Sequence, residues 1–171
     1  MKIILYCLNY KPEIVGIGKY NGELVDFLHD KGNQLRVITA PKYYPEWNVK
    51  ENKYLCENNG IAKVYRCPIY VPKSPNGIKR LLHLISFSIS SFPILLKQLI
   101  WKPDCLIMIA PTLFCAPNVF IFKFFSFKKV FTMIHIQDLE IDAAFSLGLL
   151  KGNLFKNILF KIEKLIYKNF E

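Results

Sequence analysis

The sequence predicts an α/β fold in which helices flank a parallel β-sheet. Short apolar runs alternate along the chain with longer stretches of helical period, as in parallel α/β proteins. The runs are continuously apolar, which is typical of strands buried on both faces. Of the 171 residues, 52% are hydrophobic and 15% aromatic, enough for the core of one domain. We therefore expect a single domain over residues 1–171.

The first half of the chain contains three predicted strands, over residues 2–8, 34–40 and 61–67. Between the first two, residues 17–28 place apolar side chains at helical spacing and predict an amphipathic helix. The segment 41–60 is polar and aromatic. It is too long to be a simple connection, so we expect a functional loop there.

The second half alternates helices and strands in the same way. Helices are predicted over residues 78–100 and 114–125, strands over 104–109 and 129–135, and an amphipathic helix over 155–166. The predicted sheet therefore has five strands.

Charge and cysteine content limit the class of partner and the compartment. With 23 Lys and Arg against 13 Asp and Glu, the net charge of +10 attracts nucleic acid, anionic lipid or a nucleotide sugar. Nucleic acid is the least favoured of the three, because the lysines lie mostly on helix faces and form no recognised binding module. The five cysteines include no C-x-x-C pair, and the N-terminus has no signal-peptide pattern. We therefore expect a cytoplasmic protein.

Ligands of open parallel sheets bind beyond the carboxyl ends of the strands. Prolines, hydroxyls and ionisable groups follow four of the predicted strands, beginning at Asn9, Thr39, Ala110 and His135. The strand interiors contain almost none. This asymmetry predicts a binding site at that edge of the sheet.

A glycine-rich turn precedes the first helix and contains Gly16, Gly18 and Lys19. Backbone N–H groups at a helix N-terminus bind phosphate, and Lys19 adds a positive charge. The dinucleotide fingerprint is not matched, because Gly22 falls one place late, and the P-loop pattern is absent. Two interpretations stay open: a phosphate contact, or a plain glycine-rich helix start.

His135 is the strongest candidate for chemistry. It ends the fifth predicted strand, and Asp138 follows three residues later. A histidine there can hydrogen-bond a sugar hydroxyl or phosphate while a nearby carboxylate orients the ring. The alternative is a capping or core histidine. H-x-x-D alone offers too few oxygen ligands for a hard ion, so we expect neither a metal nor another cofactor.

The loop after the second strand carries Tyr43, Tyr44, Glu46 and Trp47. Aromatic rings bind sugars by stacking, and a loop position favours function. Such clusters also occur as packing, and the sequence leaves both interpretations open.

The helix over residues 78–100 is mostly Leu, Ile and Phe around a narrow polar stripe, and Lys73, Lys79 and Arg80 precede it or lie in its first turn. Basic residues beside a broad apolar face are typical of interfacial membrane helices. Its uncharged run is shorter than the roughly 20 residues that span a bilayer, and Pro93 is expected to kink it. The alternative is a core helix packed between the sheet and a neighbouring domain.

Several collinear motifs resemble glycosyltransferase family 4 enzymes of the colanic-acid, cell-surface polysaccharide type. The motifs are N-Y-x-P-E-x-x-G-I-G-K-Y from Asn9, A-P-x-Y-Y-P-E-W from Ala40, R-C-P-x-Y-V-P from Arg66, K-R-L-L-H-L from Lys79 and H-I-Q-D-L-E-x-D-A-A-F from His135. They span about residues 1–170 in order and register.

The resemblance implies the N-terminal, acceptor-side Rossmann-like domain of a GT-B fold. It implies retaining, metal-independent transfer from a nucleotide sugar to a polyprenyl-diphosphate-linked acceptor, at the inner face of the plasma membrane. By the same resemblance Gly16, Gly18 and Lys19 contact the donor diphosphate or the reacting sugar. His135, followed by Asp138, contacts the transferred sugar. The C-terminal nucleotide-sugar domain of such enzymes has no counterpart in these residues, so we expect the chain to be inactive alone. The alternatives are a non-catalytic membrane-surface or scaffold module and a truncated relic.

Overall fold

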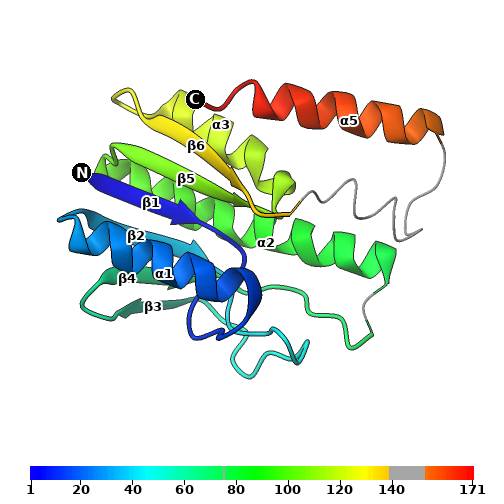
Figure 1. Ribbon diagram of the computed structural model, residues 1–171, viewed down its shortest axis with the longest axis horizontal. Helices are drawn as coiled ribbons and strands as arrows, with labels where there is room; N and C mark the ends of the chain where they lie inside the picture. The colour runs from blue at the N-terminus through cyan, green and yellow to red at the C-terminus, as the bar shows by residue number, and fades with distance from the viewer. Residues whose placement is uncertain (75, 139–152) are drawn as a thin grey trace.

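The computed structural model describes residues 1–74, 76–138 and 153–171, and its centre is a six-stranded sheet with helices on both faces (Figure 1). The strands are β1 (Lys2–Tyr6), β2 (Gln34–Thr39), β3 (Leu55–Asn58), β4 (Ala62–Arg66), β5 (Cys105–Ala110) and β6 (Phe131–Ile136). The helices are α1 (Gly16–Asp30), α2 (Gly77–Lys97), α3 (Ala116–Phe125) and α5 (Asn153–Tyr167), with short 3₁₀ turns η1 (Gln98–Trp101) and η2 (Leu113–Cys115).

Five of the strands are parallel, as the sequence predicts. The strand order is β3-β4-β2-β1-β5-β6. β2, β3 and β4 therefore lie on one side of β1, and β5 and β6 lie on the other. The order therefore reverses between β1 and β5. In open α/β sheets this reversal marks the edge at which ligands bind.

β3 is a strand that the sequence analysis missed, and the prediction of an unbroken loop over residues 41–60 is wrong at its end. β3 pairs antiparallel with β4 through a short turn at Asn59 and Gly60, where Gly60 has a φ of +82° that favours glycine. The side chains of β3 are mostly exposed, so it has no apolar alternation to reveal it. The Asn-Gly pair was the available signal.

The core has two layers, one on each face of the sheet. Alternate residues of β1 divide between them: Ile3 and Leu5 pack toward Val25 of α1, while Ile4 and Tyr6 pack toward α2 and α3. All six residues of β5 are buried. β1 and β5 are therefore covered on both sides, as predicted, whereas β6 at the edge of the sheet is largely exposed and does not meet that prediction.

Four of the five cysteines lie in the core and behave as small hydrophobic residues. Cys7, Cys67, Cys105 and Cys115 are buried free thiols, and only Cys56 is exposed. Burial raises the pKa of Cys67 to about 12 and that of Cys105 to about 11, so neither thiol is activated as a nucleophile.

A buried polar network lies between the sheet and α2. The hydroxyls of Tyr6 and Ser91 are hydrogen-bonded, and the Asn118 amide donates to Tyr6 Oη at 3.1 Å. The same amide donates to the Ser88 carbonyl at 2.8 Å, and Ser88 Oγ donates to the Phe114 carbonyl at 2.7 Å. Much of the polar surface of α2 therefore faces inward.

The consequence is an apolar outer surface on α2. Ile78 is 75% exposed and Ile89 is 69% exposed, with Leu81 and Leu82 also open to solvent. Pro93 lies inside the helix, which continues to Lys97.

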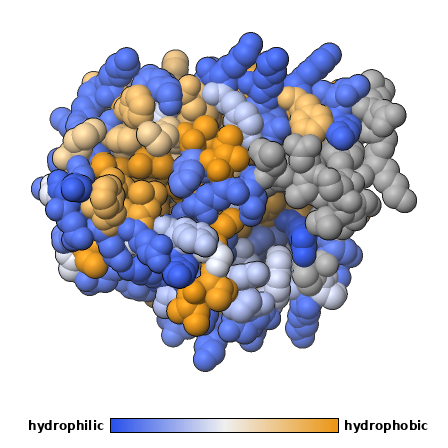
Figure 2. All heavy atoms as spheres, viewed as in Figure 1, coloured by the Kyte–Doolittle hydropathy of each residue, from blue (hydrophilic) through white to orange (hydrophobic). Residues whose placement is uncertain are grey.

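The β5–β6 half of the sheet is open on the face that α1 covers elsewhere. Phe131 and Met133, which pair with Cys105 and Ile107, remain partly exposed there. Figure 2 shows apolar side chains gathered on this face beside α1.

Candidate functional site

A hollow of about 550 Å³ opens at the carboxyl edge of the sheet. One wall is the start of α1, and the other is the end of β6 with the residues that follow it. The lining residues are Gly16, Ile17, Tyr20, His135, Ile136, Gln137 and Asp138. The structure thus brings together two predicted groups that lie more than a hundred residues apart in the sequence.

Gly16 supplies the tight entry into α1. Its φ is +60°, a conformation that favours glycine. Val15 at the N-cap makes no side-chain hydrogen bond, and the first turn contains no acidic residue. The N–H groups of that turn are therefore available to an anion at the hollow.

Gly18 has a different environment from the one predicted. It is buried and does not line the hollow. A Cβ at this position would lie 2.5 Å from Oε2 and 2.6 Å from Cβ of Glu13. Gly22 is likewise close to the Lys11 side chain. These two glycines are explained by close packing of the β1–α1 loop against the helix.

Lys19 also lies apart from the hollow. Its side chain is 55% exposed and forms an i,i+4 ion pair of 3.8 Å with Glu23 on the surface of α1. Its positive charge contributes to the field near the helix start, but Lys19 does not line the hollow.

Glu13 is a buried carboxylate that the sequence analysis did not select as a site residue. It is 3% exposed and accepts a hydrogen bond from Asn9 Nδ2 at 2.9 Å. The backbone N–H groups of Tyr44 and Tyr43 donate to its other oxygen at 3.3 and 3.5 Å. Burial raises the pKa of Glu13, and these hydrogen bonds oppose the rise. The carboxylate joins the loops after β1 and β2.

Arg66 provides a second link beneath the same loops. Its guanidinium donates to the carbonyls of Lys11 at 2.9 Å and Ala40 at 3.4 Å, and it pairs with Glu57 at 2.9 Å. It thereby joins the ends of β1, β2 and β4. It was missed because the sequence does not show that three strand ends converge on one side chain.

Some aromatic side chains of the loop after β2 are packed in the core, and others are exposed. Tyr43 is buried, and its ring lies 4.7 Å from His83, while Trp47 lies 5.4 Å from the same ring. Tyr44 is 38% exposed, and its Cε1 atom lies 3.9 Å from the position that a Cβ on Gly16 would occupy. Of the two tyrosines, Tyr44 is therefore placed beside the hollow. Tyr43 instead packs in the core.

Glu46 is exposed and lies 4.0 Å from Lys42 in a surface ion pair. Such pairs contribute little to stability.

His135 and Asp138 are both exposed and both line the hollow. The remaining part of their motif, residues 139–145, lies outside the described residues. In the part of the chain that the structure describes, no group of three His, Cys, Asp or Glu side chains is placed to hold a metal ion.

The predicted basic residues gather near the start of α2. Lys73 and Arg80 are exposed and Lys79 is half-buried, with the Arg80 guanidinium 5.6 Å from the centre of the Trp47 ring. By length and composition alone, the helical stretch Gly77–Trp101 is apolar enough to cross a membrane, a test that core helices of soluble proteins also pass.

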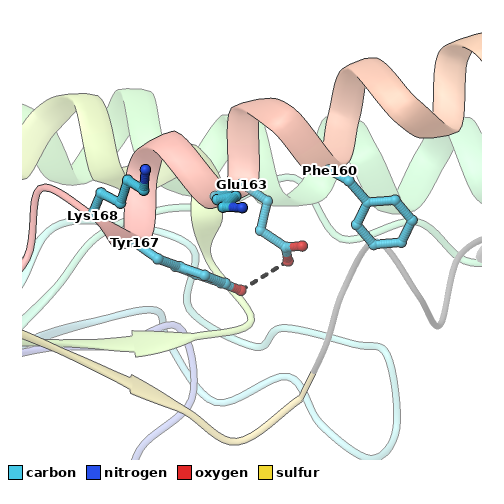
Figure 3. A pocket seen from close by; sticks show the side chains of 5 residues that line it. Phe160, Glu163, Tyr167 and Lys168 are labelled. Carbon is cyan, nitrogen blue, oxygen red and sulfur yellow. Dashed lines mark hydrogen bonds between the residues drawn. The ribbon is translucent and has the colours of Figure 1, made fainter.

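A second hollow, of about 520 Å³, lies along α5 and is shown in Figure 3. The Tyr167 hydroxyl donates a 2.8 Å hydrogen bond to the Glu163 carboxylate within it. Phe160, Lys164 and Lys168 complete the lining. None of the predicted site residues lies there.

The sequence is similar to a known glycosyltransferase. Over 153 residues it is 53% identical to the putative colanic acid biosynthesis glycosyl transferase WcaI of Escherichia coli K12. The match covers 87% of this chain and 37% of the relative, so the chain spans little more than a third of that protein. No protein-family model matches the chain.

The fold is similar to those of two solved sugar-transferring enzymes. The catalytic domain of starch synthase IV from Arabidopsis thaliana, solved with ADP and acarbose, superposes with a TM-score of 0.62 at 17% identity. The superposition covers 81% of this chain and 34% of the starch synthase chain. Sucrose-phosphate synthase from Thermosynechococcus elongatus gives 0.58 at 10% identity, covering 99% of this chain and 40% of its own.

The sheet order, the flanking helices and the likeness to these two structures give the chain a Rossmann-like fold of the GT-B type. The comparisons confirm this fold class, and the sequence match confirms the predicted relationship to glycosyltransferases of the colanic-acid type.

Proposed function

We propose that this chain is the acceptor-side half of a retaining, metal-independent family 4 glycosyltransferase that works in surface polysaccharide synthesis. The observation that carries the proposal is that the N-terminus of α1, His135 and Asp138 line the same hollow. It lies at the edge where this fold class binds ligands. The sequence match to a colanic acid glycosyl transferase agrees with it.

The two walls of the hollow suit the two parts of a nucleotide sugar. The uncapped N–H groups at Gly16, together with the helix macrodipole, favour the diphosphate and the negative charge that develops on it as the glycosidic bond breaks. His135 and Asp138 lie opposite and hydrogen-bond the hydroxyls of the transferred sugar. Lys19 attracts the anion from the surface of α1 without direct contact. In this proposal a separate donor domain holds the nucleotide, and the chain is inactive alone.

The proposed acceptor is a saccharide linked to polyprenyl diphosphate, reached at the cytoplasmic face of the plasma membrane. α2 supports this assignment, because its outer surface exposes Ile and Leu side chains while Lys73 precedes the helix and Lys79 and Arg80 lie in its first turn. Such a surface enters the headgroup region while its charges bind anionic lipid. Tyr44 and Glu46 lie on the exposed part of the loop and are the residues of that loop proposed to contact the acceptor.

The test joins the chain, by fusion or as a complex, to the donor domain of a related enzyme. Sugar transfer to a polyprenyl-diphosphate acceptor is then measured with the unaltered chain and with His135→Ala. Transfer that falls at least 100-fold with His135→Ala would support the proposal, since positioned proton-transfer and binding groups commonly contribute that much. No transfer from an assembled unaltered complex would overturn it.

A second candidate function is a non-catalytic module bound to the membrane surface. The same apolar face of α2 favours it, because that face does not depend on the hollow. The two candidates separate in the same assay: lipid binding without any transfer supports the module.

A further inference from the structure

We propose that Gln137 recognises a sugar hydroxyl through its side-chain carbonyl oxygen. Gln137 follows β6 directly and lines the hollow between His135 and Asp138, yet the proposed function gives it no role. The inference rests on the proposed function, and it names the part of the substrate that this residue contacts.

The orientation of the Gln137 amide follows from a chain of hydrogen bonds that begins at a backbone carbonyl. The carbonyl of Asn9 can only accept, so the side chain of Asn21 must turn its NH₂ group toward it, at 2.8 Å. The Asn21 oxygen then faces Gln137, which must donate through Nε2, at 2.9 Å. The assignment of oxygen and nitrogen on both amides is thereby fixed by chemistry.

The chain of bonds ends on an unused acceptor. Gln137 Oε1 is shielded from bulk water and has no hydrogen-bond donor within residues 1–74, 76–138 and 153–171. A buried carbonyl without a donor is unfavourable, and a ligand in the hollow that donates a hydrogen bond to it removes that penalty.

Because Gln137 Oε1 can only accept a hydrogen bond, it can bind only a ligand group that donates one. Phosphate oxygens are acceptors at neutral pH and are repelled by a carbonyl oxygen, whereas a sugar hydroxyl donates. Gln137 is therefore matched to a hydroxyl, and the α1 N-terminus across the hollow is matched to the diphosphate. That hydroxyl belongs either to the transferred sugar or to the acceptor saccharide.

A purely structural role makes a different prediction. Holding the end of β6 against α1 needs only the Nε2 bond to Asn21, so a structural Gln137 would affect every substrate equally. A residue that recognises one hydroxyl loses its effect when that hydroxyl is removed.

The experiment uses the chain in complex with a donor domain that takes UDP-glucose. Values of kcat/KM are measured for UDP-glucose and for each of its single deoxy analogues, with polyprenyl-diphosphate-linked glucose as acceptor. A second series keeps UDP-glucose and varies the acceptor by the same deoxy substitutions. Both series are run with the unaltered chain, with Gln137→Leu, and with Gln34→Leu as the matched control, since Gln34 is exposed at the start of β2 at the opposite end of the sheet.

In the unaltered complex, one deoxy analogue should lower kcat/KM by about 10-fold or more, because the buried acceptor is then left unpaired. Gln137→Leu should lower kcat/KM for the parent substrates by about the same factor and abolish the further loss with that analogue. The series in which this happens identifies the donor or the acceptor sugar. The Gln34→Leu complex should behave as the unaltered one.

Deoxy penalties that are the same with and without Gln137 would overturn the inference while leaving the proposed function intact. No transfer by the unaltered complex would overturn the proposed function and this inference with it. Urea unfolding of each variant checks the fold, and Gln137→Ala serves as a second variant if the leucine is not tolerated.

Discussion

Helices α1 and α2 lie on opposite faces of the sheet, and both turn small or polar side chains toward it, with different results. On α1, Gly18 and Gly22 lie so close to the β1–α1 loop that side chains there would collide with it. Asn21 between them is fully buried and bonded to that loop. The inward face of α1 therefore shapes the hollow.

On α2, buried polar groups turn the apolar residues outward. On the side of α2 that faces the sheet, Ser91 is hydrogen-bonded to Tyr6, and the Ser88 carbonyl accepts a hydrogen bond from Asn118. His83 is 2% exposed and bonds the Tyr70 carbonyl at 2.6 Å. Partners in the core thus fix the rotation of α2, and its exposed Ile and Leu side chains follow from that rotation. α1 therefore helps to form the candidate site, whereas α2 exposes an apolar surface to solvent.

The largest effect is expected at the outer surface of α2. Replacing Lys73, Lys79 and Arg80 by Gln should weaken binding to vesicles containing phosphatidylserine on the order of 100-fold, since each basic residue near an anionic surface contributes about 1 kcal/mol. Sedimentation with vesicles at low ionic strength measures this.

The matched control for that surface has the same loss of charge elsewhere. Lys31, Lys63 and Lys129 are exposed lysines outside α2, and their replacement by Gln should change vesicle affinity far less. Equal losses for the two triple variants would show that net charge, and not the α2 surface, governs lipid binding.

The next effect concerns the network that fixes the rotation of α2. Asn118→Ala removes hydrogen bonds to Tyr6 and Ser88 and leaves a small cavity, so it should lower the free energy of unfolding by about 2–3 kcal/mol. Urea denaturation measures the loss, with the exposed Asn48→Ala as control. A loss as small as that of the control would mean that apolar packing alone orients the helix.

Both helices were predicted from periodicity, but their rotation about their own axes was not. The apolar spacing of α1 and α2 gives the helix positions to within a few residues. It cannot show that Ser91 finds a partner in Tyr6, 85 residues away on β1, or that Ser88 finds one in Asn118, 30 residues away on α3. The apolar spacing therefore did not show which polar side chains of α2 are buried.

The residues of the candidate site also divide into those that local sequence predicted and those that depend on tertiary contacts. Gly16 and His135 were predictable, because a glycine-rich helix start and a histidine at a strand end can be recognised from the neighbouring residues in the sequence. Asn9, Asn21 and Glu13 were not, since each acts through a buried contact between loops. Gly18 was predicted to bind phosphate, but the packing of Glu13 against it accounts for the glycine without a ligand.

A smaller effect distinguishes two glycines on α1. Gly18→Ala puts a Cβ against the Cβ and buried carboxylate of Glu13, and it should cost about 1–2 kcal/mol after the gain in helix propensity. Gly22→Ala meets Cε and Cγ of the Lys11 side chain, which is half-exposed and can shift by loosening its ion pair with Asp26, so its cost should be smaller than that of Gly18→Ala. Thermal unfolding of the two variants gives the comparison. Equal costs would mean that the β1–α1 loop adjusts as easily at Glu13 as at Lys11.

The smallest effect is a pH dependence that comes from His83 on α2. Burial lowers the pKa of His83, and the hydrogen bond with Tyr70 only partly opposes this. The unfolded chain therefore binds a proton more readily than the folded chain between the folded pKa and the unfolded value of about 6.5. In that window stability rises with pH, so acidification below about pH 6.5 should destabilise the fold.

His83→Gln should remove that part of the pH dependence, because glutamine does not titrate. His29→Gln, at the end of α1, is the matched control and should retain it. Urea midpoints measured from about pH 7 to 5 give the slopes. If the slope persists in His83→Gln, a group other than His83 causes the loss of stability in acid.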